Sequence, residues 1–181
     1  MIMKKVFTLA TLMLALVLTS TVSAQEFSGI DKSPMDMAAY PTDYKVSEKA
    51  VRIIYGRPQL KGRSMEELAP TGKVWRTGAN EAPEITFYKD VKFGGKDVKA
   101  GTYSLFTIPG ADEWTVILNT NLNQWGSYFY DEASDVARVT VPNGSDAASL
   151  EEFSIAFKEA NGGTQLVMGW DKTRVAVPIT M

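Results

Sequence analysis

Short apolar segments separated by Gly- and Pro-containing turns run through most of this chain. Phe153, Ile155 and Phe157 alternate with smaller or polar residues, which is the period of two expected of a strand with one buried face. Thr102–Ile108 is instead apolar on both faces, as in a central strand that is covered on both sides. We therefore expect eight or nine strands in an all-β fold, either a β-sandwich or a flattened barrel.

Turn signals bound the predicted strands. Gly94-Gly95 predicts a tight hairpin within Val91–Val98, because a Gly pair adopts the positive φ of a two-residue turn. Asn161–Gly163 predicts another turn near the end of the chain. The remaining strands are expected at Val51–Tyr55, Glu84–Tyr88, Trp114–Leu118, Asp135–Val141, Glu152–Lys158, Gln165–Trp170 and Thr173–Ile179.

Helical signals are few. Ser64 and Glu67 form a capping-box pattern, and Pro70 ends whatever helix they begin, so we expect only one or two short helical turns. Residues 25–49 are polar and predict an N-terminal extended arm or a short edge strand. Residues 50–181 are then expected to form a single β-sandwich domain.

The first 24 residues have the pattern of a signal peptide. Two lysines precede the apolar stretch Val6–Leu18, and Val22–Ala24 fits a cleavage site after Ala24. This stretch is shorter than the roughly 20 residues that cross a bilayer. We therefore expect an exported protein, periplasmic or extracellular, with no membrane span after removal of the signal peptide.

The composition excludes several classes of site. The chain has no Cys and no His, which rules out thiol nucleophiles, Ser-His-Asp triads and zinc sites built from those residues. Its net charge is −2, so we do not expect the broad basic face of a nucleic-acid-binding protein. The acidic segments Asp131–Asp135 and Asn143–Asp146 do not match a calcium loop. We expect no metal site and no cofactor, and the sequence does not predict the oligomeric state.

One segment is cationic in an otherwise acidic chain. From Arg52 to Arg76 there are six Lys or Arg residues against two Glu residues. A guanidinium offers a planar fork of donors to carboxylates, phosphates or sulfates, and a Trp ring adds a flat apolar wall. We expect a small polar, anionic or glycan-like ligand here, bound by Arg57, Lys61, Arg63, Trp75, Arg76, Asn80 and Glu81.

Several longer strings carry a resemblance to a known family. They are Gly56–Pro58, Lys61–Arg63, Val74–Glu81, Lys99–Pro109 and Glu113–Ile117. Through them the chain resembles the domain-of-unknown-function family 2911, whose members look like exported, mostly β proteins of Bacteroidetes-like bacteria. The resemblance covers most of the chain after residue 24. It implies no catalytic residue, because no activity is established for that family.

The leading hypothesis is a non-enzymatic binding module, and three alternatives stay open. The cationic segment could be a structural clasp in which Arg76 pairs with Glu81 and Asn80 caps a turn. The chain could be a carboxylate-dependent hydrolase or lyase that uses Glu81 with Glu84, or the acids in 131–135. It could also be a structural partner in an envelope assembly, which requires an exposed apolar patch.

The aromatic residues divide into two groups. Trp125–Tyr130 is dense and follows a polar segment, so it predicts either an exposed stacking platform for glycans or packing over the open end of the sandwich. We favour packing, since large aromatic side chains bury most of their area. Other aromatic residues have strand periodicity and are expected in the core: Phe106, Trp114, Phe153, Phe157 and Trp170.

Overall fold

Nine antiparallel strands make up most of the computed structural model, which describes residues 26–181. Along the sheet their order is β1-β2-β3-β6-β7-β8-β9-β4-β5, with β1 and β5 at the two ends, so the sheet does not close into a barrel. The all-β prediction and the expected number of strands are confirmed. The strands are β1 (Met35–Tyr40), β2 (Val51–Gly56), β3 (Glu84–Phe87), β4 (Val91–Phe93), β5 (Lys96–Val98), β6 (Gly101–Ile108), β7 (Glu113–Asn119), β8 (Asp135–Ala160) and β9 (Gly163–Thr180).

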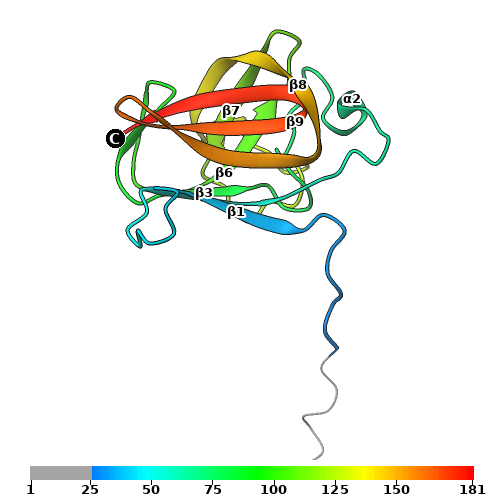
Figure 1. Ribbon diagram of the computed structural model, residues 1–181, viewed down its shortest axis with the longest axis horizontal. Helices are drawn as coiled ribbons and strands as arrows, with labels where there is room; N and C mark the ends of the chain where they lie inside the picture. Colours follow the sequence, from blue (N-terminus) through cyan, green and yellow to red (C-terminus); the bar gives the residue numbers. More distant parts are fainter. Residues whose placement is uncertain (1–25) are drawn as a thin grey trace, which may run out of the picture. The chain divides into compact units, whose positions relative to one another are not determined.

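The long strand β8 belongs to two layers (Figure 1). Its first part, 135–142, pairs with β7 in the layer that also contains β1, β2, β3 and β6. From Asn143 onward β8 pairs with β9, and the end of β9 pairs with β4. The orange and red parts of β8 and β9 lie over the first layer in Figure 1, and one main hydrophobic core contains residues of both layers.

β8 and β9 are continuous where the sequence predicted four separate strands. Within β8, the pairing register shifts between Ser145 and Leu150 and again before Ser154, so the strand bends instead of ending. Within β9, Asp171 has a φ of 46°, and pairing with β8 continues on both sides of it. Irregularities of this kind add twist and curvature, which lets one strand pass from the first layer to the second.

The local turn and helix signals are confirmed. Gly94 and Gly95 have φ values of 55° and 85° and join β4 to β5. The short helix α2 (Met65–Leu68) has the expected capping box, in which the Glu67 carboxylate accepts from the Ser64 backbone N–H at 2.7 Å. These bonds from Ser64 lower the pKa of the Glu67 carboxyl. A single 3-10 turn, η1 (Glu132–Ser134), precedes β8.

Part of the predicted N-terminal arm is a strand at the edge of the sheet. β1 pairs with β2 from Met35–Gly56 to Tyr40–Val51, and Ala38 and Tyr40 pack against the main core. Lys32–Met181 forms one compact unit, whereas residues 26–31 belong to a separate unit and contain no helix or strand. The predicted signal peptide and its cleavage site lie outside the described residues. Within residues 26–181, no helix has the length and apolar character needed to cross a membrane.

Aromatic rings fill the centre of the main core. The rings of Trp75 and Trp170 are stacked with their centroids 5.5 Å apart, and Phe153 and Trp114 meet Trp75 edge to face. All of these side chains are buried, as are the other aromatic residues expected in the core, which confirms that prediction. Phe106 is buried in a second, smaller cluster, because successive residues of a strand face opposite sides of the sheet.

Replacement of Gly94 by Ala should destabilise the protein more than replacement of Gly95. Both residues have positive φ, so either alanine costs about 1 kcal/mol of backbone strain. A Cβ on Gly94 would also collide with Val139 of β8, whereas nothing lies within 4 Å of a Cβ on Gly95. Urea denaturation should show an additional loss of about 1–3 kcal/mol for Gly94→Ala. Val139→Ala should recover part of that loss, and equal losses for the two glycines would contradict the packing.

Candidate functional site

Arg57, the residue directly after β2, connects β1 to β8 through its guanidinium group. Nη1 donates to Asp36 Oδ2 of β1 at 3.0 Å, and Nη2 donates to Ser154 Oγ of β8 at 2.7 Å. Nε donates to the carbonyl oxygen of Phe153 at 3.1 Å. Every guanidinium nitrogen of Arg57 therefore bonds to this chain, and Asp36 neutralises its charge. For Arg57 the arrangement is that of a structural clasp.

Arg63 and Lys61 hold the segment that follows β2. Arg63 donates from Nε to the carbonyl oxygen of Leu60 at 3.0 Å and from Nη2 to that of Gln59 at 2.9 Å. The backbone N–H of Lys61 donates to Glu151 Oε1 at 2.7 Å, and its side chain is exposed. The Arg63 guanidinium and the Lys61 backbone thus fasten the turn before α2.

Trp75 does not offer its ring to the surface, which corrects the expectation that it forms a wall of the site. Its side chain is only 5% exposed and stacks on Trp170. The reason is local pairing: the backbone of Trp75 donates to and accepts from Thr107 of β6 at 2.7 and 3.0 Å. This extended backbone directs Trp75 into the main core, while Val74 packs on the second cluster at the other face.

Arg76 is a half-buried cation without a counter-ion. Its Nε is buried and lacks an acceptor, and within residues 26–181 no hydrogen bond or ion pair engages the guanidinium. The pair with Glu81, which belonged to the alternative of a structural clasp, is not formed, and Glu81 is exposed. Burial lowers the pKa of Arg76, and the nearby Tyr128 hydroxyl partly opposes this effect. Because a guanidinium stays protonated in proteins, the fold partly buries an uncompensated charge.

The backbone next to Arg76 is strained and closely packed. Thr77 has a φ of 58°, which is unusual for a β-branched residue, and its buried hydroxyl donates to Thr107 Oγ1 at 3.0 Å. A Cβ on Gly56 would collide with the carbonyl group of Ala79, so only glycine lets β2 pass this close. Strained residues that tertiary contacts hold in place are concentrated at functional sites.

The loop 76–83 is joined to a second loop, 120–130, by backbone pairing. Gly126 N–H donates to the carbonyl oxygen of Asn80 at 2.9 Å, and Ala82 N–H donates to that of Gln124 at 2.8 Å. Glu81 and Trp125 form a β-bridge between these two bonds. Two segments that the sequence analysis considered separately, the cationic one and the aromatic one, therefore lie side by side.

Both interpretations of the aromatic segment apply, but to different residues. Trp125, Tyr128 and Phe129 are 57%, 78% and 75% exposed, which fits a platform. Tyr130 instead packs edge to face on Phe106, with the ring centroids 5.1 Å apart. The Tyr128 ring lies against Gly126, where a Cβ would approach it to 2.7 Å. The preference for packing thus fails for three of these four rings, because the loop covers β6 with Tyr130 alone.

A partly buried polar cluster holds the base of the aromatic loop. The Tyr130 hydroxyl donates to Asp135 Oδ2 at 2.6 Å, and Arg138 Nη1 donates to the same oxygen at 2.7 Å. The other carboxylate oxygen of Asp135 accepts from Asn119 Nδ2 at 2.8 Å. Burial and the bond to Asp135 raise the pKa of Tyr130, so the hydroxyl stays a donor. The sequence analysis missed this cluster, since no recognised motif has its spacing.

Several acids considered for catalysis make structural contacts. Asp135 has both oxygens engaged, and the Glu84 carboxylate accepts from the Asn123 backbone N–H at 2.9 Å. Asp131 accepts from the Ala133 N–H at 3.0 Å, and Glu132 lies 3.7 Å from Arg138. Between residues 26 and 181 there is no cluster of three side chains suited to a metal ion.

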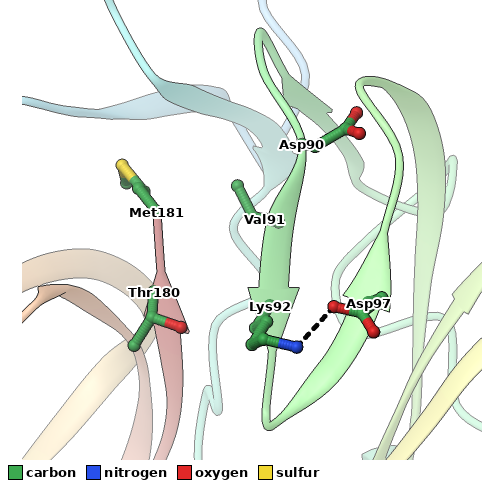
Figure 2. A pocket seen from close by; sticks show the side chains of 6 residues that line it. All are labelled: Asp90, Val91, Lys92, Asp97, Thr180 and Met181. Atoms are coloured by element: carbon green, nitrogen blue, oxygen red, sulfur yellow. Dashed lines mark hydrogen bonds and ion pairs between the residues drawn. The ribbon is translucent and has the colours of Figure 1, made fainter.

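A shallow hollow of about 290 Å³ lies at a different place, between the β4–β5 hairpin and the end of β9 (Figure 2). Figure 2 shows the Lys92 ammonium directed at Asp97, and Asp90 pairs with Lys99. The charges are therefore neutralised within the chain. The hollow contains none of the predicted site residues, and we do not assign a ligand to it. It is lined by Asp90, Val91, Lys92, Asp97, Thr180 and Met181.

Replacement of Arg57 and of Arg76 by Met should have opposite effects on stability. Arg57→Met removes three hydrogen bonds and leaves Asp36 without its cation, so we expect a loss of about 1–3 kcal/mol in urea denaturation. Arg76→Met removes an uncompensated charge that opposes folding at neutral pH, so we expect no loss, or a gain of up to about 1 kcal/mol. A loss for Arg76→Met as large as that for Arg57→Met would show that both residues are clasps.

Comparison with known proteins places the chain in a family. A family model described as "Protein of unknown function (DUF2911)" matches residues 33–179. No curated protein and no solved structure matches the chain. The matched range extends from just before β1 almost to the end of β9, and it includes both loops of the candidate site. The chain therefore belongs to the DUF2911 family, as the strings from Gly56 to Ile117 indicated.

Proposed function

We propose that this protein is an exported binding module that recognises an anionic group at Arg76. One contrast supports the proposal. Arg57 and Arg63 come from the same cationic segment and donate to acceptors of this chain, whereas the half-buried Arg76 guanidinium has no acceptor among the described residues. Arg52 also has a buried Nε without an acceptor, but it belongs to β2, so Arg76 is the one of these two that lies in a loop. A carboxylate or sulfate of a ligand would supply the missing counter-charge in the bidentate geometry that suits a guanidinium.

The uncompensated charge of Arg76 also affects the stability of the folded protein. A partly buried charge without a partner destabilises the folded state, so a chain selected for stability alone has no reason to keep it. Charges of this kind are retained where a ligand compensates them, at a cost to the free protein. The strain at Thr77, next to Arg76, supports the same interpretation.

The neighbouring side chains complete the proposed site. Asn80 lies on the same loop, and within residues 26–181 its side-chain amide makes no hydrogen bond, so a ligand can use it. Glu81 is exposed and offers acceptors to ligand hydroxyls. Trp75 anchors the start of the loop 76–83 in the main core, whereas Arg57 and Arg63 make their contacts outside the two loops. Binding is favoured over turnover, since Glu84 and Asp135 are engaged in structural contacts.

The test uses the purified chain with three small probes, namely galacturonate, sulfate and neutral galactose. Galacturonate or sulfate should raise the unfolding temperature and titrate by calorimetry, because a ligand that binds only the folded state stabilises it by mass action. Arg76→Met should abolish this effect. Arg63→Met is the matched control, since it removes the same charge from the same segment but leaves Arg76 in place, and it should retain binding. Equal anion binding by wild type and Arg76→Met would overturn the proposal.

One observation favours the alternative of a structural partner. Met35, Met37 and Ile54 are exposed large apolar residues of β1 and β2, and Met37 is the direct cross-strand neighbour of Ile54. Exposed apolar residues on neighbouring strands are typical of interaction surfaces. If this surface joins copies of the chain, light scattering should give an oligomer for wild type and a monomer for Met37→Lys. A monomeric wild type would exclude self-assembly.

A further inference from the structure

The exposed side chains of Trp125, Tyr128 and Phe129 indicate which class of anionic ligand the site binds. We propose that the ligand is an acidic oligosaccharide whose sugar rings stack on Trp125 and Tyr128 while a carboxylate or sulfate substituent pairs with Arg76. This inference rests on the proposed function of Arg76. It adds that the ligand presents sugar rings to the exposed side chains of the segment Trp125–Phe129 as well as an anionic group to Arg76.

The rings of Trp125, Tyr128 and Phe129 are exposed, yet the backbone beneath them is held in place. Large aromatic side chains usually bury most of their area, so three exposed rings within five residues indicate a contact surface. Trp125 lies in a β-bridge with Glu81, and the next residue, Gly126, donates to Asn80. The backbone under the rings is therefore held by the loop 76–83. Positioned aromatic rings lose little conformational entropy when a ligand binds.

The two loops that carry Arg76 and the rings also carry polar side chains that a sugar can bind. A sugar ring has an apolar face of C–H groups and a rim of hydroxyls, so its site needs flat aromatic surface together with side-chain donors and acceptors. Within residues 26–181, the side-chain amides of Asn80 and Asn123 make no hydrogen bond with the chain. Both residues adopt positive φ, at 62° and 57°, in the two loops that carry Arg76 and the rings.

Two other kinds of polymer, single-stranded nucleic acid and peptides, fit this surface less well than a glycan. Single-stranded nucleic acid also stacks on aromatic rings, but it needs a track of free cations along its phosphates. Here the whole chain has a net charge of −2, so its electrostatic attraction to a phosphate backbone is weak. A peptide that adds a strand needs an open sheet edge, whereas the loop 120–130 covers the face of β6 and β7, which are interior strands.

The charge of Arg76 favours an acidic glycan over a neutral one. Stacking and hydrogen bonds to hydroxyls would be enough to bind a neutral sugar. With such a ligand, the partly buried charge of Arg76 would lower the stability of the folded protein without contributing to binding. Arg76 begins the loop that pairs with the aromatic loop at Asn80 and Glu81, so we assign the charged substituent of the ligand to the guanidinium and its sugar rings to the neighbouring aromatic side chains. Carboxylated and sulfated sugars share this chemistry, and the experiment separates them.

The experiment measures binding of three tetrasaccharides by calorimetry at fixed salt. They are an oligogalacturonate, a sulfated galactan fragment and the neutral cellotetraose. Wild type should bind one of the acidic tetrasaccharides at least tenfold more tightly than cellotetraose and more tightly than single galacturonate. Trp125→Ala and Tyr128→Ala should each weaken that binding by about tenfold, as expected for the loss of one stacked ring. Tyr88→Ala removes a ring that is 53% exposed outside these loops and should leave binding unchanged.

The outcomes distinguish this inference from the function on which it rests. Binding that requires Arg76 but neither ring, with equal affinity for galacturonate and its tetramer, would overturn the glycan class and leave the anion site intact. Equal binding of cellotetraose that requires Trp125 but not Arg76 would overturn both proposals. Tighter binding of a single-stranded oligonucleotide would also overturn the glycan class. Because both rings are largely exposed, their alanine variants should fold, which urea denaturation checks.

Discussion

The stacking of Trp75 on Trp170 is the contact on which the arrangement of the candidate site depends. It places a residue of a long irregular segment in the middle of the main core, where Phe153 and Trp114 surround it. Backbone hydrogen bonds between Trp75 and Thr107 then hold this segment beside β6. The loop that starts with Arg76 is thereby held at the other face of the first layer.

Two arginines of one segment show how context divides a single residue type into two roles. The Arg57 guanidinium has an acceptor for each of its nitrogens and connects β1 to β8. The Arg76 guanidinium is also partly buried but has no acceptor in the described chain. The first contributes hydrogen bonds to stability, whereas the second is a charge that the free protein does not compensate. This difference is the basis for placing ligand recognition at Arg76.

The parts of the fold that depend on residues close together along the chain could be predicted from the sequence. Gly94 and Gly95 specify their hairpin because only positive φ closes a two-residue turn, and Ser64 with Glu67 specifies a helix start through local hydrogen bonds. The continuity of β8 did not follow. Its register shifts near Leu150 depend on how β9 lies beside it, and local propensity does not contain that information.

By itself, the sequence determined the all-β class, the excluded chemistries, the family resemblance and the presence of a cationic segment. Only the tertiary structure decided which cations are neutralised, that Trp75 is buried, and that the aromatic loop lies against Asn80 and Glu81. The physical reason is the range of the interactions. Turns, caps and strand periodicity act over a few residues, whereas counter-ions and loop pairing join segments that are distant along the chain and meet only once the core has formed.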